Sequence, residues 1–335
     1  MSAAEADWTS AVGLLAAYDE VVLACHVGPD GDALGSMLAL GIALRDRGTK
    51  VRASFGSEPF EVPAAYTGLP GLDLLVPVAQ IPEAPGLLVI FDTGSIDRLG
   101  ALADRVPAAA DVLVIDHHVS NTRFGTVNLV DVDAAATAVV VVELLDRLGL
   151  PLTAEIAAPV YTGLVTDTGS FKYAGTTPAV HELAARLLAT GIRHDLISRD
   201  IWDNASFGYV QLLGAACARA VLEPAAVAGL GLVWTTVTDA DLTATGLALS
   251  DVEGVIDVVR TAREAEVAAV LKHDPADGWL KVSTRSKGAV DVGAVCGSLG
   301  GGGHRFAAGF TSGDDVDGTL DKLRAALAAA PHLPV

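Results

Sequence analysis

Short apolar runs alternate with amphipathic stretches along the first 190 residues of the chain. Four runs rich in Val, Leu and Ile predict buried strands at residues 21–25, 51–55, 87–91 and 112–115. Helical periodicity follows at about residues 35–47, 136–148, 153–166 and 179–190, with Gly191 as the expected cap of the last helix. This alternation predicts an α/β fold with a doubly wound, mostly parallel sheet.

The pattern changes beyond residue 191. Residues 194–222 have helical periodicity without a strand partner, and a segment with Pro and small residues follows at 222–229. The remainder predicts a second, smaller α+β domain, with strands at 230–236, 267–272 and 279–284 and helices at about 251–263, 291–298 and 315–329. We therefore expect a first domain over 1–191, a helical linker over 192–229 and a second domain over 230–335.

Composition narrows the class of protein. With 335 residues, of which 51% are hydrophobic and 19% charged, the chain can bury a large core. It has no apolar stretch near the roughly 20 residues of a membrane helix, and its first residues carry acids where a signal peptide carries Lys or Arg. Three widely spaced cysteines argue against disulfides and a thiolate zinc site. We expect a cytoplasmic protein with no membrane partner.

The net charge of −19 bears on the partners of the protein. A protein that coats long nucleic acid by phosphate contacts needs a broad basic surface, so long nucleic acid is not an expected partner. A small phosphorylated ligand remains compatible with this charge, because bound divalent cations would make a local pocket positive.

Side chains that bind metal ions follow the predicted elements in four places. They are His26, Asp30, Asp32, Asp92, Asp116, His117 and His118 behind strands, and Asp167 behind an apolar helix. Each group alone has a simpler explanation as a turn, a helix cap or a surface pair. Together, at the carboxyl ends of parallel strands, they predict a two-metal site of the kind that hydrolyses phosphoesters. Carboxylate and imidazole ligands favour Mn²⁺, with Mg²⁺ or Co²⁺ as alternatives.

The same segments resemble the motifs of a known family. HVGPDGDALGS, FDTGS, VIDHHVSN and GLVTDTGSF, which begin at residues 26, 91, 114 and 163, resemble the four motifs of the DHH phosphoesterase superfamily. STRSK at 283–287 and SLGGGGHRFAAGF at 298–310 resemble the first type of DHH-associated domain. The set and the order of these motifs resemble those of the NrnA-like subfamily of bifunctional oligoribonucleases and pAp phosphatases. The resemblance covers nearly the whole chain.

The resemblance implies roles for the metal-binding side chains. It implies that His26 and Asp30 hold one metal ion, and it gives the second ion the ligands Asp32, His117 and Asp167. Asp92 would bridge both ions. Of the remaining two motif residues, His118 would face the scissile phosphate, and Asp116 would accept a hydrogen bond from an imidazole and so orient that ring.

Other residues are candidates for substrate binding. The glycine cluster Gly301, Gly302 and Gly303, with His304, is either a flexible loop or a backbone nest for a phosphate or base. The basic segment Arg285, Ser286 and Lys287 would hold the far phosphate or ribose of the substrate. Arg98 and Arg123 follow two of the motifs and are candidates for substrate contacts or surface ion pairs.

We therefore expect an enzyme that hydrolyses very short oligoribonucleotides and linear or cyclic dinucleotides, such as pApA or cyclic di-AMP, to mononucleotides. Removal of phosphate from pAp is a compatible second activity. The alternatives are a single-strand exonuclease, an exopolyphosphatase or a pyrophosphatase of the same superfamily, and a cyclic dinucleotide sensor without catalysis. The apolar composition and the predicted linker helices also favour a homodimer.

Overall fold

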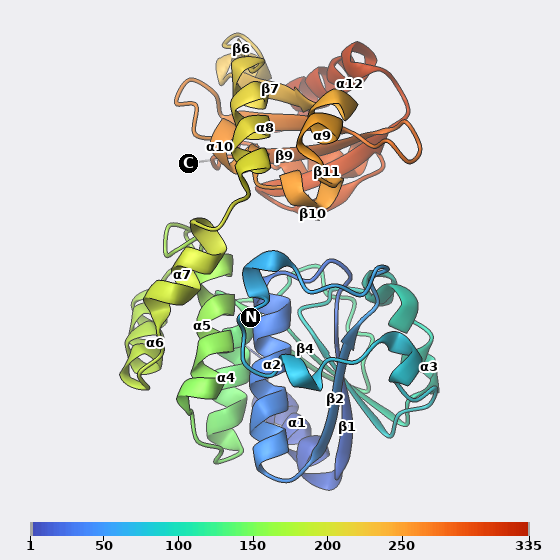
Figure 1. The fold of residues 1–335 in the computed structure, drawn as a ribbon, viewed down its shortest axis with the longest axis vertical. Helices are drawn as coiled ribbons and strands as arrows, with labels where there is room; N and C mark the ends of the chain where they lie inside the picture. Colours follow the sequence, from blue (N-terminus) through green and yellow to red (C-terminus); the bar gives the residue numbers. More distant parts are fainter. Residues whose placement is uncertain (1–2, 334–335) are drawn as a thin grey trace. The chain divides into compact units, whose positions relative to one another are not determined.

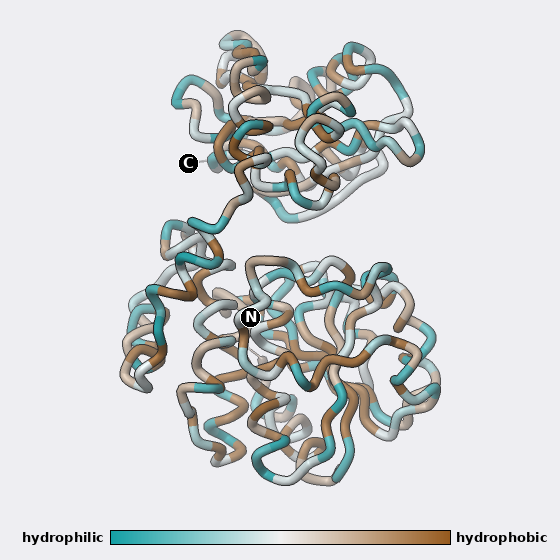
Figure 2. The backbone as a smooth tube through the Cα atoms, in the orientation of Figure 1, coloured by the Kyte–Doolittle hydropathy of each residue, from teal (hydrophilic) through white to brown (hydrophobic). Residues whose placement is uncertain are grey.

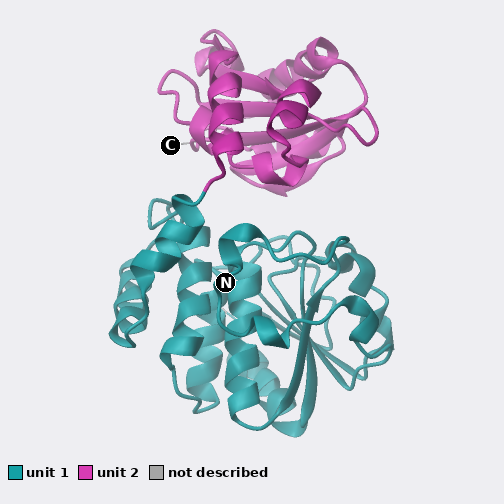
Figure 3. Cartoon of the chain, viewed as in Figure 1, with its two compact units in different colours: residues 1–204 teal, residues 205–335 magenta. Residues whose placement is uncertain are grey.

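The computed structural model describes residues 3–333 of the chain. The chain divides into two compact units, Met1–Asn204 and Ala205–Val335 (Figure 1, Figure 3). Each unit has its own sheet and its own hydrophobic core. Figure 2, in which brown marks apolar residues, shows apolar segments in both units.

Unit 1 is built on a parallel sheet with the strand order β2-β1-β3-β4-β5. The strands are β1 (Glu20–Cys25), β2 (Lys50–Phe55), β3 (Leu87–Phe91), β4 (Asp111–Asp116) and β5 (Val127–Val130). The first four coincide with the predicted runs. The strand β5 was not predicted, because its four residues are too few for an alternation to show.

Both faces of this sheet are covered, which confirms the predicted doubly wound fold. On one face, strand residues such as Leu23 pack against the inner helices, which are α1 (Glu5–Ala17), α2 (Gly31–Asp46), α4 (Thr137–Arg147) and α5 (Ala154–Asp167). On the other face, neighbouring strand residues such as Ala24 pack against η4 (Ile96–Leu102) and α3 (Arg105–Ala108). Successive strand residues point to opposite faces, so strands covered on both sides are apolar throughout.

The register of the sheet aligns the ends of its three central strands. Cys25 at the end of β1 pairs with Phe91 at the end of β3, and Phe91 pairs with Ile115 in β4. The next residue of each strand therefore lies at the same edge of the sheet. Those residues are His26, Asp92 and Asp116.

Close packing between α2 and α5 depends on glycines. A Cβ at Gly35 would lie 2.2 Å from the carbonyl oxygen of Pro159, and one at Gly31 would lie 2.6 Å from the side chain of Thr166. A Cβ at Gly163 would lie 2.7 Å from Asp32 Oδ1. The absence of side chains at these positions brings the two helices together, side by side with α4 in Figure 1. This contact places Asp32 of α2 near the carboxyl end of α5.

The connection between the units differs from the expected linker over 192–229. The helices α6 (Pro178–Ala189) and α7 (His194–Trp202) belong to unit 1, where α7 contacts α5. After a break, α8 (Phe207–Ala218) packs against the sheet of unit 2. The predicted helical character is present, but the stretch is shared between the two units instead of forming a separate segment.

Unit 2 contains a mixed sheet with the order β10-β11-β9-β8-β7-β6. Its strands are β6 (Val221–Glu223), β7 (Leu232–Val237), β8 (Val267–His273), β9 (Leu280–Ser286), β10 (Gly302–His304) and β11 (Ala307–Ser312). The helices α11 (Val292–Ser298) and α12 (Val316–Ala329) cover one face. The opposite face is covered by α8, α9 (Asp239–Thr245) and α10 (Val255–Val259). The predicted smaller α+β domain is confirmed.

Two details of unit 2 differ from the predictions. The helix expected at 251–263 is the short α10, which follows a 3-10 turn at Leu249–Val252. The glycine cluster, for which a flexible loop was one of two expectations, contributes Gly302 and Gly303 to the edge strand β10, which is paired antiparallel with β11. Among residues 3–333, no helix combines the length and the apolar character that crossing a bilayer requires.

Candidate metal centre

The edge of the unit 1 sheet gathers the predicted metal-binding side chains. Asp92 directly follows β3 and takes a left-handed backbone conformation with φ of 52°. Its amide still donates to the carbonyl of Ile115 at 3.0 Å, so the backbone turns sharply at the moment it leaves the sheet. A non-glycine residue with positive φ costs free energy and is frequent at functional sites. The carboxylate is only 4% exposed.

The amino-terminal turn of α2 supplies two further carboxylates. Asp30 caps the helix, since its Oδ1 accepts from the amides of Asp32 and Ala33 at 3.1 and 3.0 Å. Asp32 is fully buried and reaches the amino terminus of α4, where its two oxygens accept from the amides of Thr137 at 2.6 Å and Ala138 at 2.9 Å. These bonds leave both carboxylates in fixed orientations.

Two imidazoles have their tautomers set by backbone carbonyls. His26 Nδ1 lies 2.9 Å from the carbonyl oxygen of Val27, and His117 Nδ1 lies 3.1 Å from that of Ala134. A carbonyl oxygen only accepts, so each Nδ1 carries the hydrogen. The lone pair of each neutral ring is therefore on Nε2, the atom that can bind a metal ion.

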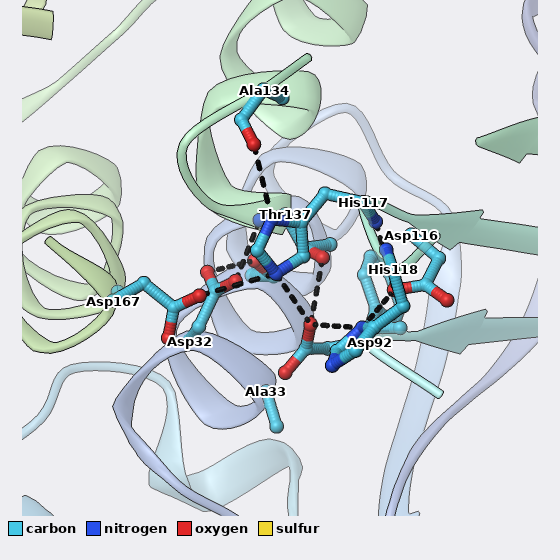
Figure 4. Close-up of polar contacts among 12 residues, drawn as sticks. Asp32, Ala33, Asp92, Asp116, His117, His118, Ala134, Thr137 and Asp167 are labelled. Atoms are coloured by element: carbon cyan, nitrogen blue, oxygen red, sulfur yellow. Dashed lines mark hydrogen bonds and ion pairs between the residues drawn. The ribbon is translucent and has the colours of Figure 1, made fainter. Parts of the chain in front are cut away.

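The Nε2 atom of each ring lies between two carboxylates, as Figure 4 shows for His117. His26 Nε2 is 3.8 Å from Asp30 Oδ1 and 3.7 Å from Asp92 Oδ2. His117 Nε2 is 3.1 Å from Asp167 Oδ2 and 3.7 Å from Asp92 Oδ1. The two oxygens of Asp92 thus face different imidazoles, which is the arrangement expected of a bridging carboxylate.

The structure brings the six predicted ligands together as two groups. One group is His26, Asp30 and Asp92, the other is Asp32, His117 and Asp167, and within each the ligand atoms lie within 4.8 Å of one another. A third possible group contains Asp92, His117 and His118. We favour the first two, because the Nδ1 atom of His118 that faces Asp92 is already bonded to Asp116 at 2.7 Å.

Asp116 lies behind the ligands and has no exposed surface. Its Oδ1 accepts from His118 Nδ1 and, at 2.8 Å, from the amide of His117, while Oδ2 accepts from Asn121 Nδ2 at 2.6 Å. Burial opposes the charged form, but the bonds from His118 and Asn121 lower the pKa of Asp116. An ionised Asp116 therefore orients the ring of His118.

The electrostatics of the cluster indicate a shortage of positive charge. Burial opposes a charged His26, yet the carboxylates of Asp30 and Asp92 raise its pKa to about 10. His117 is likewise opposed by burial, but Asp167 and Asp32 raise its pKa to about 11. Burial and the neighbouring charges of Asp92 and Asp167 raise the pKa of Asp32 well above its usual range. A divalent cation would supply the charge that protons supply here, so these residues fit a metal site.

Thr137 is a further residue of the centre, and the sequence analysis missed it. Its fully buried hydroxyl donates to Asp92 Oδ1 at 2.9 Å, and its amide donates to Asp32 Oδ2 (Figure 4). One residue thus holds a carboxylate from each group. Its position at the start of a predicted helix was the only available signal, and helix starts often carry Thr.

The two candidate arginines lie in segments next to the centre. Asn121 Nδ2 donates to the carbonyl of Thr93 at 3.1 Å, and the Thr122 amide donates to that of Gly94 at 2.9 Å, which joins the loops after β3 and β4. Arg98 is exposed in η4, which follows the first of these loops, and Arg123 is exposed on the second loop. Among the described residues, neither guanidinium has a carboxylate within 4.0 Å, so both are available to an anionic ligand.

In unit 2, two of the three candidate glycines are required by the fold. A Cβ at Gly301 would lie 2.1 Å from the carbonyl oxygen of Gly309. Gly303 has φ of +141°, and its Cβ would lie 2.6 Å from Ala308 Cα. A Cβ at Gly302 would meet no atom within 4 Å. Like these glycines, His304 is exposed on the edge strand β10.

The three residues of the basic segment differ in burial and in hydrogen-bond partners. Arg285 is half-buried, with its Nε 3.9 Å from Asp257 Oδ1, and Lys287 is exposed and donates to the carbonyl of Ala262. Ser286 is only 2% exposed, and its hydroxyl donates to Glu266 Oε1 at 2.7 Å. The alternation of β9 turns the Ser286 side chain into the core, where its hydroxyl is used by the fold, whereas Arg285 lies on the other face of the strand.

We expect Mn²⁺ binding to the metal-free protein near neutral pH to release protons. His26 and His117 have pKa values raised to about 10 and 11, so their Nε2 atoms must lose protons before they can bind an ion. The apparent affinity should rise as the pH increases from about 6 to about 9. Calorimetry in two buffers of different ionisation enthalpy counts the released protons, and a count of zero would contradict these ligands.

We also expect Thr137→Val to weaken Mn²⁺ binding by roughly 10-fold to 100-fold. Valine keeps the branched shape but removes the hydroxyl that orients Asp92. Thr162→Val is the matched control, since Thr162 is buried in α5 and donates to the carbonyl of Ala158 in its own helix. Calorimetric titration of both variants checks this, and equal weakening would argue for a general packing effect.

Comparisons with known proteins agree with the motifs. Residues 20–164 match the DHH family, N-terminal domain, and residues 242–331 match the DHHA1 domain. The chain is similar to the bifunctional oligoribonuclease and PAP phosphatase NrnA of Thermus thermophilus, with 37% identity over 92% of this chain and 90% of that protein. It is also similar to the protein of the same name from Bacillus subtilis, with 26% identity over 94% and 97% of the two chains.

A solved structure shows the same fold. The exopolyphosphatase-related protein from Bacteroides fragilis has a TM-score of 0.88 and 22% identity, over 97% of this chain and 96% of that one. The family predicted from the motifs is confirmed by the matched domains and by the Thermus thermophilus relative. This chain belongs to the DHH family and carries a DHHA1 domain in its second unit.

Proposed function

We propose that this protein is a metal-dependent phosphoesterase that hydrolyses very short oligoribonucleotides and dinucleotides, such as pApA or cyclic di-AMP, to mononucleotides. Removal of phosphate from pAp is part of the proposal, since the Thermus and Bacillus relatives carry both activities in their names. The observation that carries it is the pair of ligand groups that share the two oxygens of Asp92. A sensor without catalysis would not need this full set of ligands.

The proposed cofactor is a pair of divalent cations. His26, Asp30 and Asp92 would hold one, and Asp92 with Asp32, His117 and Asp167 would hold the other. Carboxylate oxygens with imidazole nitrogens suit Mn²⁺, with Mg²⁺ and Co²⁺ as alternatives. When bound, such a pair neutralises the phosphate and activates water for in-line attack.

The residues of this chain would bind the substrate and donate a proton to it. Burial opposes a charged His118, but the carboxylates of Asp116 and Asp92 raise its pKa above the ordinary value of an imidazole. With Nδ1 bonded to Asp116, the Nε2–H group can donate to a phosphate oxygen or to the leaving oxygen. Arg98 and Arg123, in the neighbouring segments, would bind phosphates.

The proposal extends to the second unit. In this unit, the proposed substrate contacts are Arg285, Lys287 and His304, together with the backbone at Gly302. The support is that Gly302 is exposed and that nothing in the fold requires a glycine there. A glycine on an edge strand allows a ligand to approach the backbone closely.

We infer a homodimer from the surface of α8. This helix has no Asp, Glu, Lys, Arg or His, yet Phe207 is 75% and Val210 53% exposed. A second copy of so acidic a chain meets the least charge repulsion at such a face. The cytoplasmic location also remains a proposal, supported by three cysteines that are all free.

The substrate is tested with purified protein and Mn²⁺. The panel contains pApA, cyclic di-AMP, pAp, a five-nucleotide RNA, a long single-stranded DNA and pyrophosphate, with products separated by chromatography. We expect turnover of the short ribonucleotides and of pAp. Turnover of pyrophosphate alone, or of long DNA alone, would replace this proposal with one of the alternatives.

We expect Asp92→Asn to reduce turnover of pApA by at least about 100-fold, because the amide cannot supply two anionic oxygens to two ions. Asp104→Asn is the matched control. Asp104 is exposed and makes no side-chain cap bond, so the same chemical change there should leave the rate unaltered. Steady-state kinetics measures pApA turnover by both variants. An active Asp92→Asn variant would exclude the bridging role of Asp92.

We expect Gly302→Ala to raise KM for pApA by about 10-fold, since a methyl group would obstruct a ligand that approaches the backbone. The variant should unfold like the wild type, because this methyl meets no protein atom. Gly303→Ala should instead destabilise unit 2 by roughly 1–3 kcal/mol, owing to the contact with Ala308 and the positive φ. Thermal unfolding and KM values separate the two effects, and an unchanged KM for Gly302→Ala would exclude this contact.

A further inference from the structure

The turn that follows Asp167 carries an aromatic side chain that the proposed mechanism does not use. Tyr173 lies six residues after Asp167 and is 44% exposed. The same turn contains Phe171, whose ring stacks on His181 of α6 with a centroid distance of 5.0 Å and an interplanar angle of 30°. One aromatic ring thus anchors the turn to unit 1, while the other keeps a large exposed surface.

The backbone of this turn is held rigidly. The Ser170 amide donates to the carbonyl of Val165 at 2.8 Å, and the Tyr173 amide donates to that of Thr168 at 3.0 Å. The buried Thr168 hydroxyl accepts from the Phe171 amide at 3.1 Å. Ser170 and Phe171 both have positive φ, at 57° and 66°. A side chain on such a turn loses little further freedom when a ligand binds to it.

The Tyr173 ring packs against the neighbouring backbone. Gly169 has φ of +56°, and a Cβ there would lie 2.4 Å from Tyr173 Cζ. The ring therefore lies against the backbone of Gly169, two residues from Asp167. At the other end of the turn, an ideal Cβ at Gly175 would lie 3.9 Å from that of Ala135. Ala135 is next to Ala134, whose carbonyl holds His117.

The turn thus runs from one candidate metal ligand to the loop that orients another. Asp167 and His117 belong to the same group, together with Asp32. A nucleotide whose phosphate is held by this group carries its base only one ribose away. The Tyr173 ring packs beside Gly169, two residues after the ligand Asp167. An exposed aromatic ring can stack on a base, and stacking is tolerant of sequence because every base has a π-face.

We propose that Tyr173 is a stacking platform for the nucleobase of the nucleotide that adjoins the scissile phosphate. This inference rests on the proposed function and adds the part of the substrate that is recognised beside the metals. It explains how an enzyme with a net charge of −19 gains affinity for short oligoribonucleotides of any sequence without a broad basic surface.

The experiment compares pApA with an analogue in which one adenine is replaced by hydrogen, prepared for each of the two positions. The preference of the wild type for pApA over one of these analogues, measured as the ratio of kcat/KM values, should fall by about 5-fold to 150-fold in Tyr173→Ala. The loss should lie mainly in KM. Tyr173→Phe keeps the ring and should retain the preference, which separates stacking from any role of the hydroxyl group.

Trp202→Ala is the matched control, because Trp202 is a 50% exposed aromatic residue elsewhere in unit 1. It should retain the wild-type preference. An unchanged preference in Tyr173→Ala, or an equal loss in Tyr173→Phe, would overturn the inference.

A failure of the proposed function gives a different result. If the wild type cleaves none of these compounds, the proposed function is wrong, and equilibrium binding of AMP in the presence of Mn²⁺ then tests the platform alone. Tyr173→Ala should weaken this binding by the same factor, and equal affinity in wild type and variant would exclude the platform.

Discussion

The buried carboxylate of Asp32 is the point on which the candidate centre depends. Burying an isolated carboxylate is costly unless hydrogen bonds compensate for the lost water. Here the amino terminus of α4 provides two amides and the favourable end of the helix dipole, and Ser36 adds a hydroxyl at 3.1 Å. Gly163 of α5 leaves the space that the carboxylate fills. A single side chain of α2 thereby connects the three helices that carry or orient Asp32, Asp92 and Asp167.

The sheet provides the second constraint. Because β1, β3 and β4 end at the same level, His26, Asp92 and Asp116 leave the sheet side by side. The backbone carbonyls of Val27 and Ala134 then fix which nitrogen of each metal-facing ring is free to bind an ion. Ligand geometry in this protein is thus set mainly by backbone groups, which a rigid sheet and helix termini hold in place. Such preorganisation is what two-metal chemistry requires.

In unit 2, adjacent residues of one sequence motif differ in whether the fold explains them. In the cluster of glycines, Gly301 and Gly303 are explained by close contacts with β11, whereas Gly302 is not. In the basic segment, Ser286 is used by the fold through Glu266. Composition could not separate these cases, because a glycine that the packing requires and one that it does not require look alike in sequence. The contacts with β11 show which glycines the fold requires.

The sequence by itself determined four strands of unit 1, the helices α2, α4, α5 and α6, the family, and the side chains that stand at the strand ends, because apolar runs and the residues behind them are local features. It did not determine α1, β5, the division of the expected linker between α7 and α8, or the role of Thr137. The partners of Thr137 are Asp92 and Asp32, 45 and 105 residues away along the chain. Only the tertiary structure decides such contacts, because they arise when the helices pack on the sheet and bring distant residues to the same edge.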